Sequence, residues 1–146
     1  MGGVRRRKTK GLILPMALLV GSLVACGGSI ENSNTLAGTY SATVFTVTSA
    51  GQAPINVLAA GGSLSITIAA SNSTSGSLAI PASINGGTAF NADMAGTASV
   101  SGSTVHFQQA ADTFVRDLTW SHAGTMLSVT NQAAGSASYT ITLTRQ

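Results

Sequence analysis

The sequence is poor in the residues that build disulfides and metal sites: among its 146 residues it has one cysteine and two histidines. With no second cysteine, a disulfide within the chain is excluded, and zinc sites need several cysteine or histidine ligands at close spacing. His106 alternates with apolar neighbours and should face outward, while His122 lies beside a turn. Neither histidine has a carboxylate or a cysteine at ligand spacing, so we expect no metal site and no cofactor.

Charge is also scarce, with 8% of the residues charged, and it is unevenly distributed. Five of the seven basic residues lie within positions 1–10, so the formal net charge of +3 describes the N-terminus and not the rest of the chain. From Cys26 onward there are two arginines and four acidic residues, which gives a formal net charge of −2. Because nucleic-acid affinity depends largely on lysine and arginine, this balance excludes nucleic acid as a partner.

No set of residues with catalytic spacing is present in the sequence. No serine lies in a nucleophile-elbow motif, and no glycine-rich phosphate loop occurs. Apart from Glu31, the acidic residues after Cys26 are three aspartates, and their spacing pairs none of them for acid–base chemistry. We therefore expect no catalytic residues and a protein that is not an enzyme.

The longest apolar run is "GLILPMALLVGSLVA" at residues 11–25, and it directly follows the basic segment "RRRKTK". A basic segment, a short apolar run and small residues at its end are the plan of a secretory signal peptide. The run is shorter than the ~20 residues that a membrane-spanning helix needs, and it contains Pro15 and Gly21. We therefore predict a signal peptide at residues 1–25, with a transmembrane anchor as the alternative.

The residues Leu23, Val24 and Ala25 in front of Cys26 resemble the lipobox of bacterial lipoproteins. The resemblance implies that Cys26 becomes the lipidated first residue of the mature chain and anchors it to a membrane of the bacterial cell envelope. Each buried methylene of such acyl chains, palmitate among them, contributes ~0.8 kcal/mol, so the anchoring is stable. No aspartate follows the cysteine, which favours the outer membrane if the organism is Gram-negative. The alternative is an ordinary cleaved signal peptide that leaves a free cysteine.

Residues 26–35 are small and polar and predict a flexible tether, whereas a regular alternation of apolar and polar residues begins at Leu36. In "SLSITIAA" the apolar side chains Leu64, Ile66 and Ile68 share one face, as expected of a strand with one buried side. Residues 53–60 break the pattern and predict a short helix or a turn. Eight strands, separated by turns rich in glycine, asparagine and serine, are predicted at about 38–48, 62–70, 76–82, 94–101, 103–109, 114–121, 125–130 and 137–145.

Eight sequential strands with short connections favour an antiparallel up-and-down sheet over residues 36–146. A sheet of this size removes its two edges when it closes on itself. We therefore predict an all-β domain with a closed, eight-stranded antiparallel barrel. A β-sandwich is the alternative fold.

The segment "LAGTY", followed by a long strand, resembles the Gly-x-Trp motif that opens lipocalins and related calycin barrels, with Tyr40 in place of the tryptophan. In that family an arginine of the last strand packs over the aromatic ring and closes the bottom of the barrel. Arg145 stands at the matching place and alternates with Tyr139, Ile141 and Leu143, which should face inward. The resemblance implies a lipocalin-like fold, a barrel-closing pair of Tyr40 and Arg145, and a small hydrophobic ligand.

Charge gathers in the segment "ADTFVRD". If residues 114–121 form a strand, Arg116 shares a face with Phe114 and Trp120, and this face should be the inner one. A buried arginine must be paired or must line a wet cavity, so these three residues are candidate ligand-lining positions. The alternative is structural, with Asp112 in a turn and Arg116 paired with a nearby carboxylate.

Two functions stay open from the sequence. The first is a lipid-anchored envelope lipoprotein whose barrel binds a hydrophobic or amphipathic small molecule, with room left by small inward residues such as Ala42, Gly96 and Ala98. The second is a structural or protein-interaction module with a filled barrel and exposed apolar residues such as Ile55 and Val57. An apolar cavity of ~300 Å³ or more favours ligand binding, and a packed interior favours interaction.

Replacing Cys26 with serine tests the lipoprotein assignment. Serine has no thiol for the thioether bond to diacylglycerol, so the Cys26→Ser precursor should stay unprocessed. It should also not incorporate labelled palmitate, in contrast to the unchanged chain. Efficient palmitate labelling of the variant would show that the assignment is wrong.

Overall fold

The computed structural model describes residues 36–146, which form an all-β unit. The predicted signal peptide at residues 1–25, the lipobox with Cys26 and the predicted tether at residues 26–35 lie outside the described residues. Within residues 36–146, no helix is long and apolar enough to cross a membrane.

The described part of the chain contains ten strands and two short helical turns. In chain order they are β1 (Gly38–Ser49), β2 (Ile55–Asn56), β3 (Ser63–Ile68), β4 (Ser73–Ile80), the 3₁₀ turn η1 (Ala82–Ile84), β5 (Phe90–Asp93), β6 (Gly96–Ser101), β7 (Thr104–Gln109), α1 (Phe114–Asp117), β8 (Trp120–Ala123), β9 (Met126–Ala134) and β10 (Ala137–Arg145).

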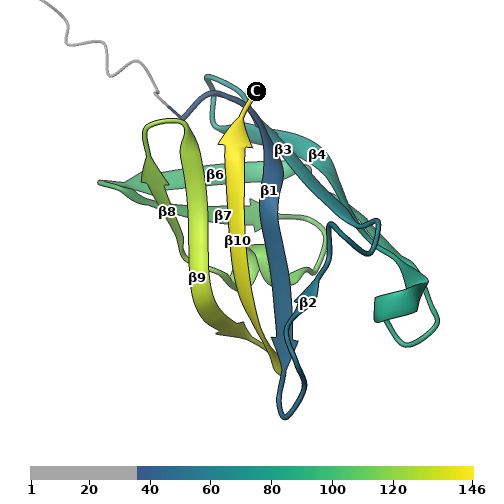
Figure 1. The fold of residues 1–146 in the computed structure, drawn as a ribbon. Coiled ribbons are helices and arrows are strands. Elements are labelled where there is room, and N and C mark those ends of the chain that lie inside the picture. Colours follow the sequence, from purple (N-terminus) through teal and green to yellow (C-terminus); the bar gives the residue numbers. More distant parts are fainter. Residues whose placement is uncertain (1–35) are drawn as a thin grey trace, which may run out of the picture. The chain divides into compact units, whose positions relative to one another are not determined.

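Eight of the strands close into an antiparallel barrel (Figure 1). Pairing runs from β1 to β3 and continues through β4, β6, β7, β8, β9 and β10. β10 then pairs along β1, from Tyr40 opposite Arg145 to Ser49 opposite Ala137, and this ladder closes the ring. The short strands β2 and β5 are additional to the ring and pair with β1 and β4. The predicted all-β barrel is confirmed, and the sandwich alternative is wrong.

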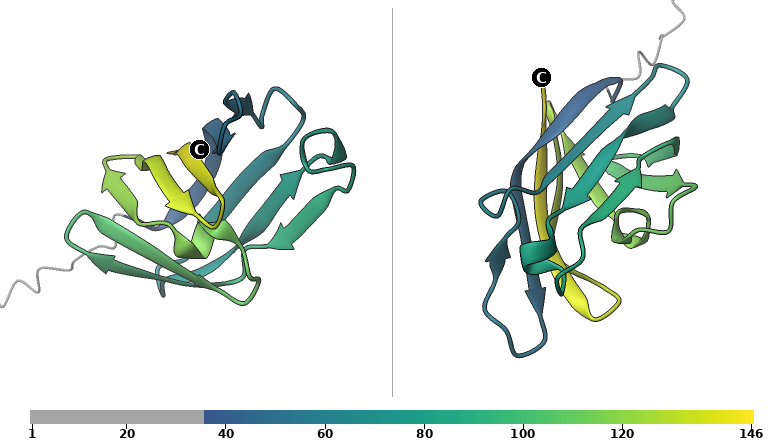
Figure 2. Two further views of the ribbon diagram at one scale, coloured as in Figure 1. Left: turned by 90° about the horizontal axis from the view of Figure 1, so that it is seen from below. Right: turned by 90° about the vertical axis from the view of Figure 1, so that its right-hand side faces the viewer.

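The strands bury one face because apolar side chains occupy every second position. In β3, for example, Leu64, Ile66 and Ile68 are buried while the residues between them are not. On the neighbouring strands β7 and β8, the ring of Phe107 packs edge-on against Trp120, with the ring centroids 5.6 Å apart. The buried apolar side chains form one contiguous cluster, so side chains fill the middle of the barrel. Figure 2 shows the strands that surround this interior, from below and from the side.

The small inward residues do not leave the room that the sequence suggested. Ala98 is buried opposite Phe107, and Ala42 packs against the core. A Cβ atom on Gly96 would lie 2.2 Å from the carbonyl oxygen of Gln108, because the backbone of β7 occupies that space. Gly96 therefore allows β6 and β7 to approach closely and creates no cavity.

The strand predicted at 114–121 is wrong in its first half, where α1 occupies Phe114–Asp117. The backbone N–H of Arg116 donates to the carbonyl of Thr113 at 3.1 Å, and the Arg116 guanidinium pairs with Asp112, four residues earlier. A helical turn brings residues at this spacing together, whereas a strand separates them. The rule that every second residue of a strand faces the same side therefore does not apply here, and Arg116 is exposed instead of facing inward.

Residues 53–60, predicted as a short helix or a turn, form the two-residue strand β2 and a following turn. The N–H of Val57 donates to the carbonyl of Phe45 at 2.8 Å, which holds this segment against β1. Val57 is consequently buried, so the expectation that it is an exposed loop residue is wrong. Ile55, by contrast, is 37% exposed.

Gly76 should be one of the positions least tolerant of substitution. Its φ is +136°, and an added Cβ would lie 2.1 Å from the carbonyl oxygen of Ser65 on β3. Gly76→Ala should lower the free energy of unfolding by about 3 kcal/mol through backbone strain and overpacking, as chemical denaturation would measure.

Gly102→Ala is the matched control, because Gly102 also has a positive φ (+60°) but nothing lies within 4 Å of an added Cβ. The control should cost only about 1 kcal/mol, the penalty of the left-handed conformation. Equal losses in the two variants would contradict the close approach of β3 and β4.

Candidate functional site

Tyr40 and Arg145 lie together at one end of the barrel, opposite each other in the β1–β10 ladder. The guanidinium carbon of Arg145 is 5.3 Å from the centroid of the Tyr40 ring, and its Nη2 donates to the Tyr40 hydroxyl at 2.7 Å. That hydroxyl donates in turn to the carbonyl of Leu36 at 2.9 Å. The structure thus brings together the two residues predicted as a barrel-closing pair.

Gly38 is the part of the "LAGTY" motif that makes room for this contact. Its φ is +151°, and an added Cβ would lie 2.9 Å from Nε of Arg145 and 3.1 Å from its Cδ. A side chain at position 38 would therefore push Arg145 away from the Tyr40 ring. The glycine and the arginine, which are far apart in the sequence, fit together as one unit.

Three aromatic side chains gather toward the other end of β1 and β10, and we call them the aromatic cluster. The ring of Phe114 stacks on Tyr139, with centroids 4.1 Å apart and an interplanar angle of 9°. Phe45 packs against Phe114 at a centroid distance of 5.8 Å. Phe45 is buried, whereas Phe114 and Tyr139 are only half-buried, so one side of the cluster is open.

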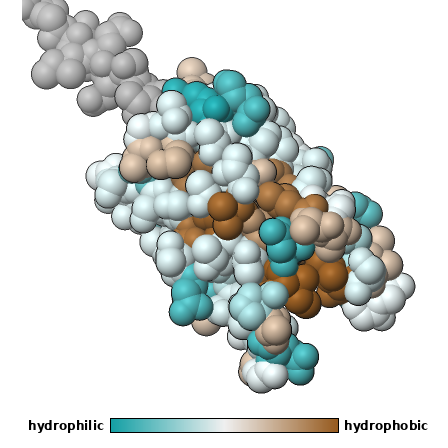
Figure 3. Space-filling model, viewed as in Figure 1, coloured by the Kyte–Doolittle hydropathy of each residue, from teal (hydrophilic) through white to brown (hydrophobic). Residues whose placement is uncertain are grey.

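Two adjoining cavities lie beside the aromatic cluster and share Ile80, Asn85 and Tyr139. The more enclosed cavity has a volume of about 170 Å³ and the wider one about 360 Å³. Their apolar lining comes from Phe45, Val47, Ile55, Val57, Ile80, Ile84, Phe90, Phe114 and Ala134. Hydrophobic surface is visible beside β2 in Figure 3. The enclosed cavity is lined mainly by apolar side chains, as is typical of small-molecule sites, while Asp112, Thr113 and Asp117 add polar groups to the wider one. We call these cavities with the aromatic cluster the mouth site.

Tyr139 supplies a neutral polar group to the mouth site. Burial raises the pKa of its phenol above the ordinary value of 10.0, because desolvation disfavours the charged phenolate. At neutral pH the hydroxyl is therefore protonated and can both donate and accept a hydrogen bond.

The charged residues at the edge of the wider cavity pair with one another. Arg116 contacts Asp112, and its Nε lies 3.8 Å from the Asp117 carboxylate. The Arg116 side chain is 41% exposed, so it does not face inward as its predicted ligand-lining role required. The structural alternative, an arginine paired with nearby carboxylates, describes this segment correctly.

Of the other two predicted ligand-lining residues, Phe114 and Trp120, only the first lies at the mouth site. Phe114 lines the wider cavity as part of the aromatic cluster. Trp120 is fully buried in the core, where its Nε1 donates to the carbonyl of Val115 at 3.2 Å, and it lines neither cavity of the mouth site.

Two buried polar side chains were missed by sequence reasoning. Gln109 and Thr113 are each 5% exposed, and Gln109 Oε1, Gln109 Nε2 and Thr113 Oγ1 have no hydrogen-bond partner within residues 36–146. Thr113 also lines the wider cavity. A signal for Gln109 was present, because it follows Val105 and Phe107 at every second position and therefore shares their inward face.

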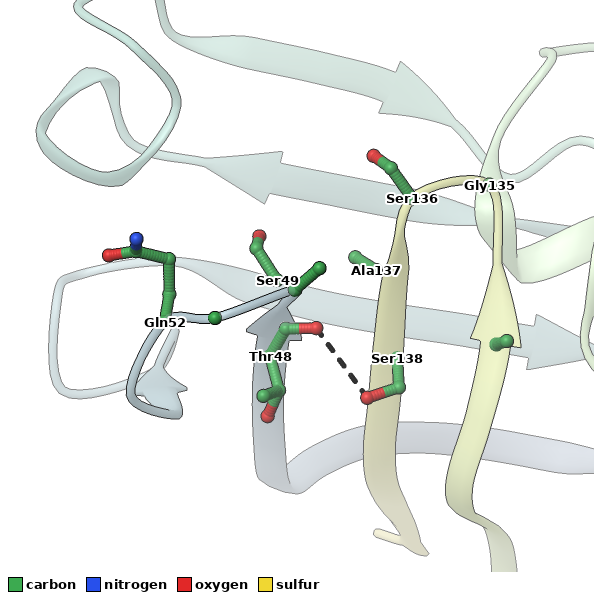
Figure 4. A pocket seen from close by; sticks show the side chains of 10 residues that line it. Thr48, Ser49, Gln52, Gly135, Ser136, Ala137 and Ser138 are labelled. Atoms are coloured by element: carbon green, nitrogen blue, oxygen red, sulfur yellow. Dashed lines mark hydrogen bonds between the residues drawn. The ribbon is translucent and has the colours of Figure 1, made fainter.

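A further groove lies between the loop after β1 and the β9–β10 hairpin (Figure 4). Its lining is small and polar, with Thr48, Ser49, Gln52, Ser136 and Ser138 among it. Ser138 Oγ donates to the carbonyl of Thr48 at 3.5 Å, so part of this polar capacity is already used. The groove has no aromatic, branched aliphatic or charged lining residue that could hold a guest, whereas the mouth site has an aromatic cluster and a partly enclosed cavity, so the mouth site is the stronger candidate.

In the described part of the chain, no three histidine, cysteine or acidic side chains lie close enough together to hold a metal ion. His106 is exposed on β7, as its alternation with apolar residues predicted. His122 Nε2 lies 2.9 Å from the carbonyl of Gly124 in the turn after β8.

The geometry defines a closed, eight-stranded antiparallel β-barrel, which is compatible with a lipocalin-like fold. In comparisons with known proteins, no family model, no curated protein and no solved structure matches the chain. The assignment of a function therefore depends on the residues of the barrel itself.

Arg145→Ala should lower the free energy of unfolding by about 2 kcal/mol, because it removes the cation–π contact, the hydrogen bond to Tyr40 and the packing of the arginine stem. Tyr40→Phe keeps the ring and loses only the hydroxyl, so it should cost about 1 kcal/mol. In chemical denaturation the double variant should lose less free energy of unfolding than the two single variants together, because the two residues share one contact.

Arg116→Ala is the matched control, since this arginine forms an exposed ion pair worth at most about 1 kcal/mol. An Arg145→Ala protein that is as stable as the Arg116→Ala control would contradict a structural role for the Tyr40–Arg145 contact.

Proposed function

We propose that the chain is a non-catalytic, membrane-anchored envelope lipoprotein whose barrel binds a hydrophobic or amphipathic small molecule at the mouth site. The anchoring part of the proposal is supported by the basic N-terminus, the apolar run at residues 11–25 and the lipobox that ends at Cys26. Acyl chains on Cys26 would hold the barrel at the membrane surface, with residues 27–35 as the connection. In a Gram-negative organism that membrane is the outer one.

The observation that carries the binding proposal is the open side of the aromatic cluster. Phe114 and Tyr139 are half-buried beside the two cavities, and Phe90 and Ile55 at the rim are each 37% exposed. A ligand that covers these side chains removes apolar surface from water, which contributes ~25 cal/mol for each Å². The aromatic rings also offer flat faces on which a planar group can stack.

The filled interior limits the ligand to the mouth site. Because the core residues form one contiguous cluster, the apolar part of a guest stays in the two cavities, against side chains such as Phe45 and Val57. Cavities of about 170 and 360 Å³ accommodate a ring or a short alkyl chain. The proposal is therefore a small guest held at one end of the barrel.

A second candidate function is a structural or protein-interaction module with a filled barrel. It is favoured by the packed interior and by Val44 and Met126, which are 41% and 46% exposed on the two strands that flank β10. Hydrophobic surface is also visible over β1 in Figure 3. Single exposed apolar side chains are ordinary on protein surfaces, so ligand binding is proposed first.

Titration of the full chain with an apolar naphthalene dye, followed by its fluorescence, tests ligand binding at the mouth site. Phe114→Ala removes one half of the aromatic stack and one wall of the wider cavity. It should weaken dye binding about tenfold, which corresponds to about 1.4 kcal/mol.

Met126→Ala is the control, because Met126 is exposed on β9 and lines neither cavity of the mouth site. It removes a comparable apolar side chain and should leave dye binding unchanged. If the two variants weaken binding equally, the dye does not occupy the mouth site. If the unchanged chain binds no dye, the interaction module is the better proposal.

A further inference from the structure

The buried amide of Gln109 is an exception to the apolar interior of the barrel. Gln109 is the last residue of β7 and pairs with Gly96 of β6, so no side chain stands opposite it in the ladder. Its exposed fraction is 5%, and neither Oε1 nor Nε2 has a hydrogen-bond partner within the part of the chain that the structure describes. Both halves of the amide are therefore available to something else.

Thr113 provides a second buried, unpartnered polar group, and this one belongs to the mouth site. Its Oγ1 is buried and has no partner among the described residues, and the residue itself lines the wider cavity. Three residues separate it from Gln109 in the chain, and the α1 segment that follows packs against β7. Thr113 therefore lies in the wall of the wider cavity, and Gln109 ends the strand against which α1 packs.

Such groups indicate a missing partner. Burying an amide or a hydroxyl without a hydrogen bond is unfavourable, and most buried polar atoms in proteins are satisfied. Thr74, in the same row of the barrel wall opposite Gly96, illustrates the usual outcome, since its Oγ1 donates to the carbonyl of Met94 at 2.8 Å. Gln109 and Thr113 have no equivalent contact.

The unpartnered polar atoms of Gln109 and Thr113 indicate which chemical group could bind there. Gln109 offers one acceptor and two donor hydrogens, and Thr113 offers a hydroxyl that can do either. The nearby Arg116 is already paired with Asp112 and Asp117, so it does not balance a buried charge. A charged group would be costly in such a place, which favours a neutral group that both donates and accepts.

We infer that Gln109 and Thr113 form a polar subsite that binds the neutral hydroxyl end of an amphipathic guest whose apolar part occupies the mouth site. This inference rests on the proposed function. It assigns the ligand class to apolar molecules with an alcohol end and disfavours fatty acid anions. Water has the same hydrogen-bonding chemistry, so the experiment must separate a bound hydroxyl of the guest from bound water.

Three matched probes test the inference on the full chain: butylbenzene, phenylbutanol and phenylbutanoate. The sequence has one tryptophan, so fluorescence reports on Trp120 alone, which packs on Phe107 two residues before Gln109. The quantity to compare is the ratio of the affinity for phenylbutanol to that for butylbenzene. Gln109→Met keeps the length of the side chain and removes the amide, and it should lower this ratio about tenfold. Phenylbutanoate should bind the unchanged chain most weakly of the three.

Gln108→Met is the matched control, because Gln108 is exposed on the opposite face of β7. It should leave the ratio unchanged. Thr113→Val is a second variant with nearly the same shape, so the test holds even where Gln109→Met fails to fold. It should also lower the ratio.

The remaining outcomes separate the inference from the proposed function. If both neutral probes bind and Gln109→Met leaves their ratio unchanged, the inference is overturned while ligand binding stands. If in addition Gln109→Met lowers the unfolding temperature of the empty protein and Gln108→Met does not, water is the partner of the amide. If the unchanged chain binds no probe, the proposed function fails and the subsite fails with it.

Discussion

The contact of Arg145 with Tyr40 fixes where the sheet closes on itself. The two residues are direct partners in the β1–β10 ladder, and a slip of one residue would turn every side chain of β10 to the other face. Gly38 leaves the space in which the guanidinium lies over the ring, and the Tyr40 hydroxyl holds the carbonyl of Leu36. One contact therefore joins the first strand, the last strand and the residues that precede the barrel.

The same two strands carry the mouth site at their other ends. Phe45 lies on β1 and Tyr139 on β10, beyond a shift of the register between Ala42 and Val44, so this irregularity decides which aromatic rings meet beside the cavities. The third ring belongs to α1, which stands where a longer strand would continue the wall. Because α1 is a turn and not a strand, Phe114 stacks on Tyr139 while Arg116 points to solvent.

The alternation of apolar and polar residues predicted the barrel because each strand buries one face, and "LAGTY" with Arg145 predicted the meeting of its two ends. The same rule failed at α1, where "FVRD" also fits a strand. Part of the reason lies far away in the sequence, in the side chain of Gln132. It accepts a hydrogen bond from the N–H of Thr119 at 2.9 Å and donates one to the Thr119 carbonyl at 2.7 Å, so Thr119, just after α1, bonds to a side chain in place of a neighbouring strand. The cavities depend on how side chains from distant strands fill space, which no local pattern records.

Gln109 and Thr113 are unusual because nearly all the other buried residues of the barrel are apolar. The described residues contain two arginines and three aspartates, and the interior is otherwise almost entirely apolar. In such an interior an unpaired amide stabilises nothing, and an apolar side chain of the same size would avoid its desolvation cost. An apolar cavity alone discriminates poorly between guests of similar size, whereas buried groups that require a hydrogen bond reject guests that lack it. In the proposed subsite, the amide would lower the stability of the empty barrel and raise its selectivity among guests.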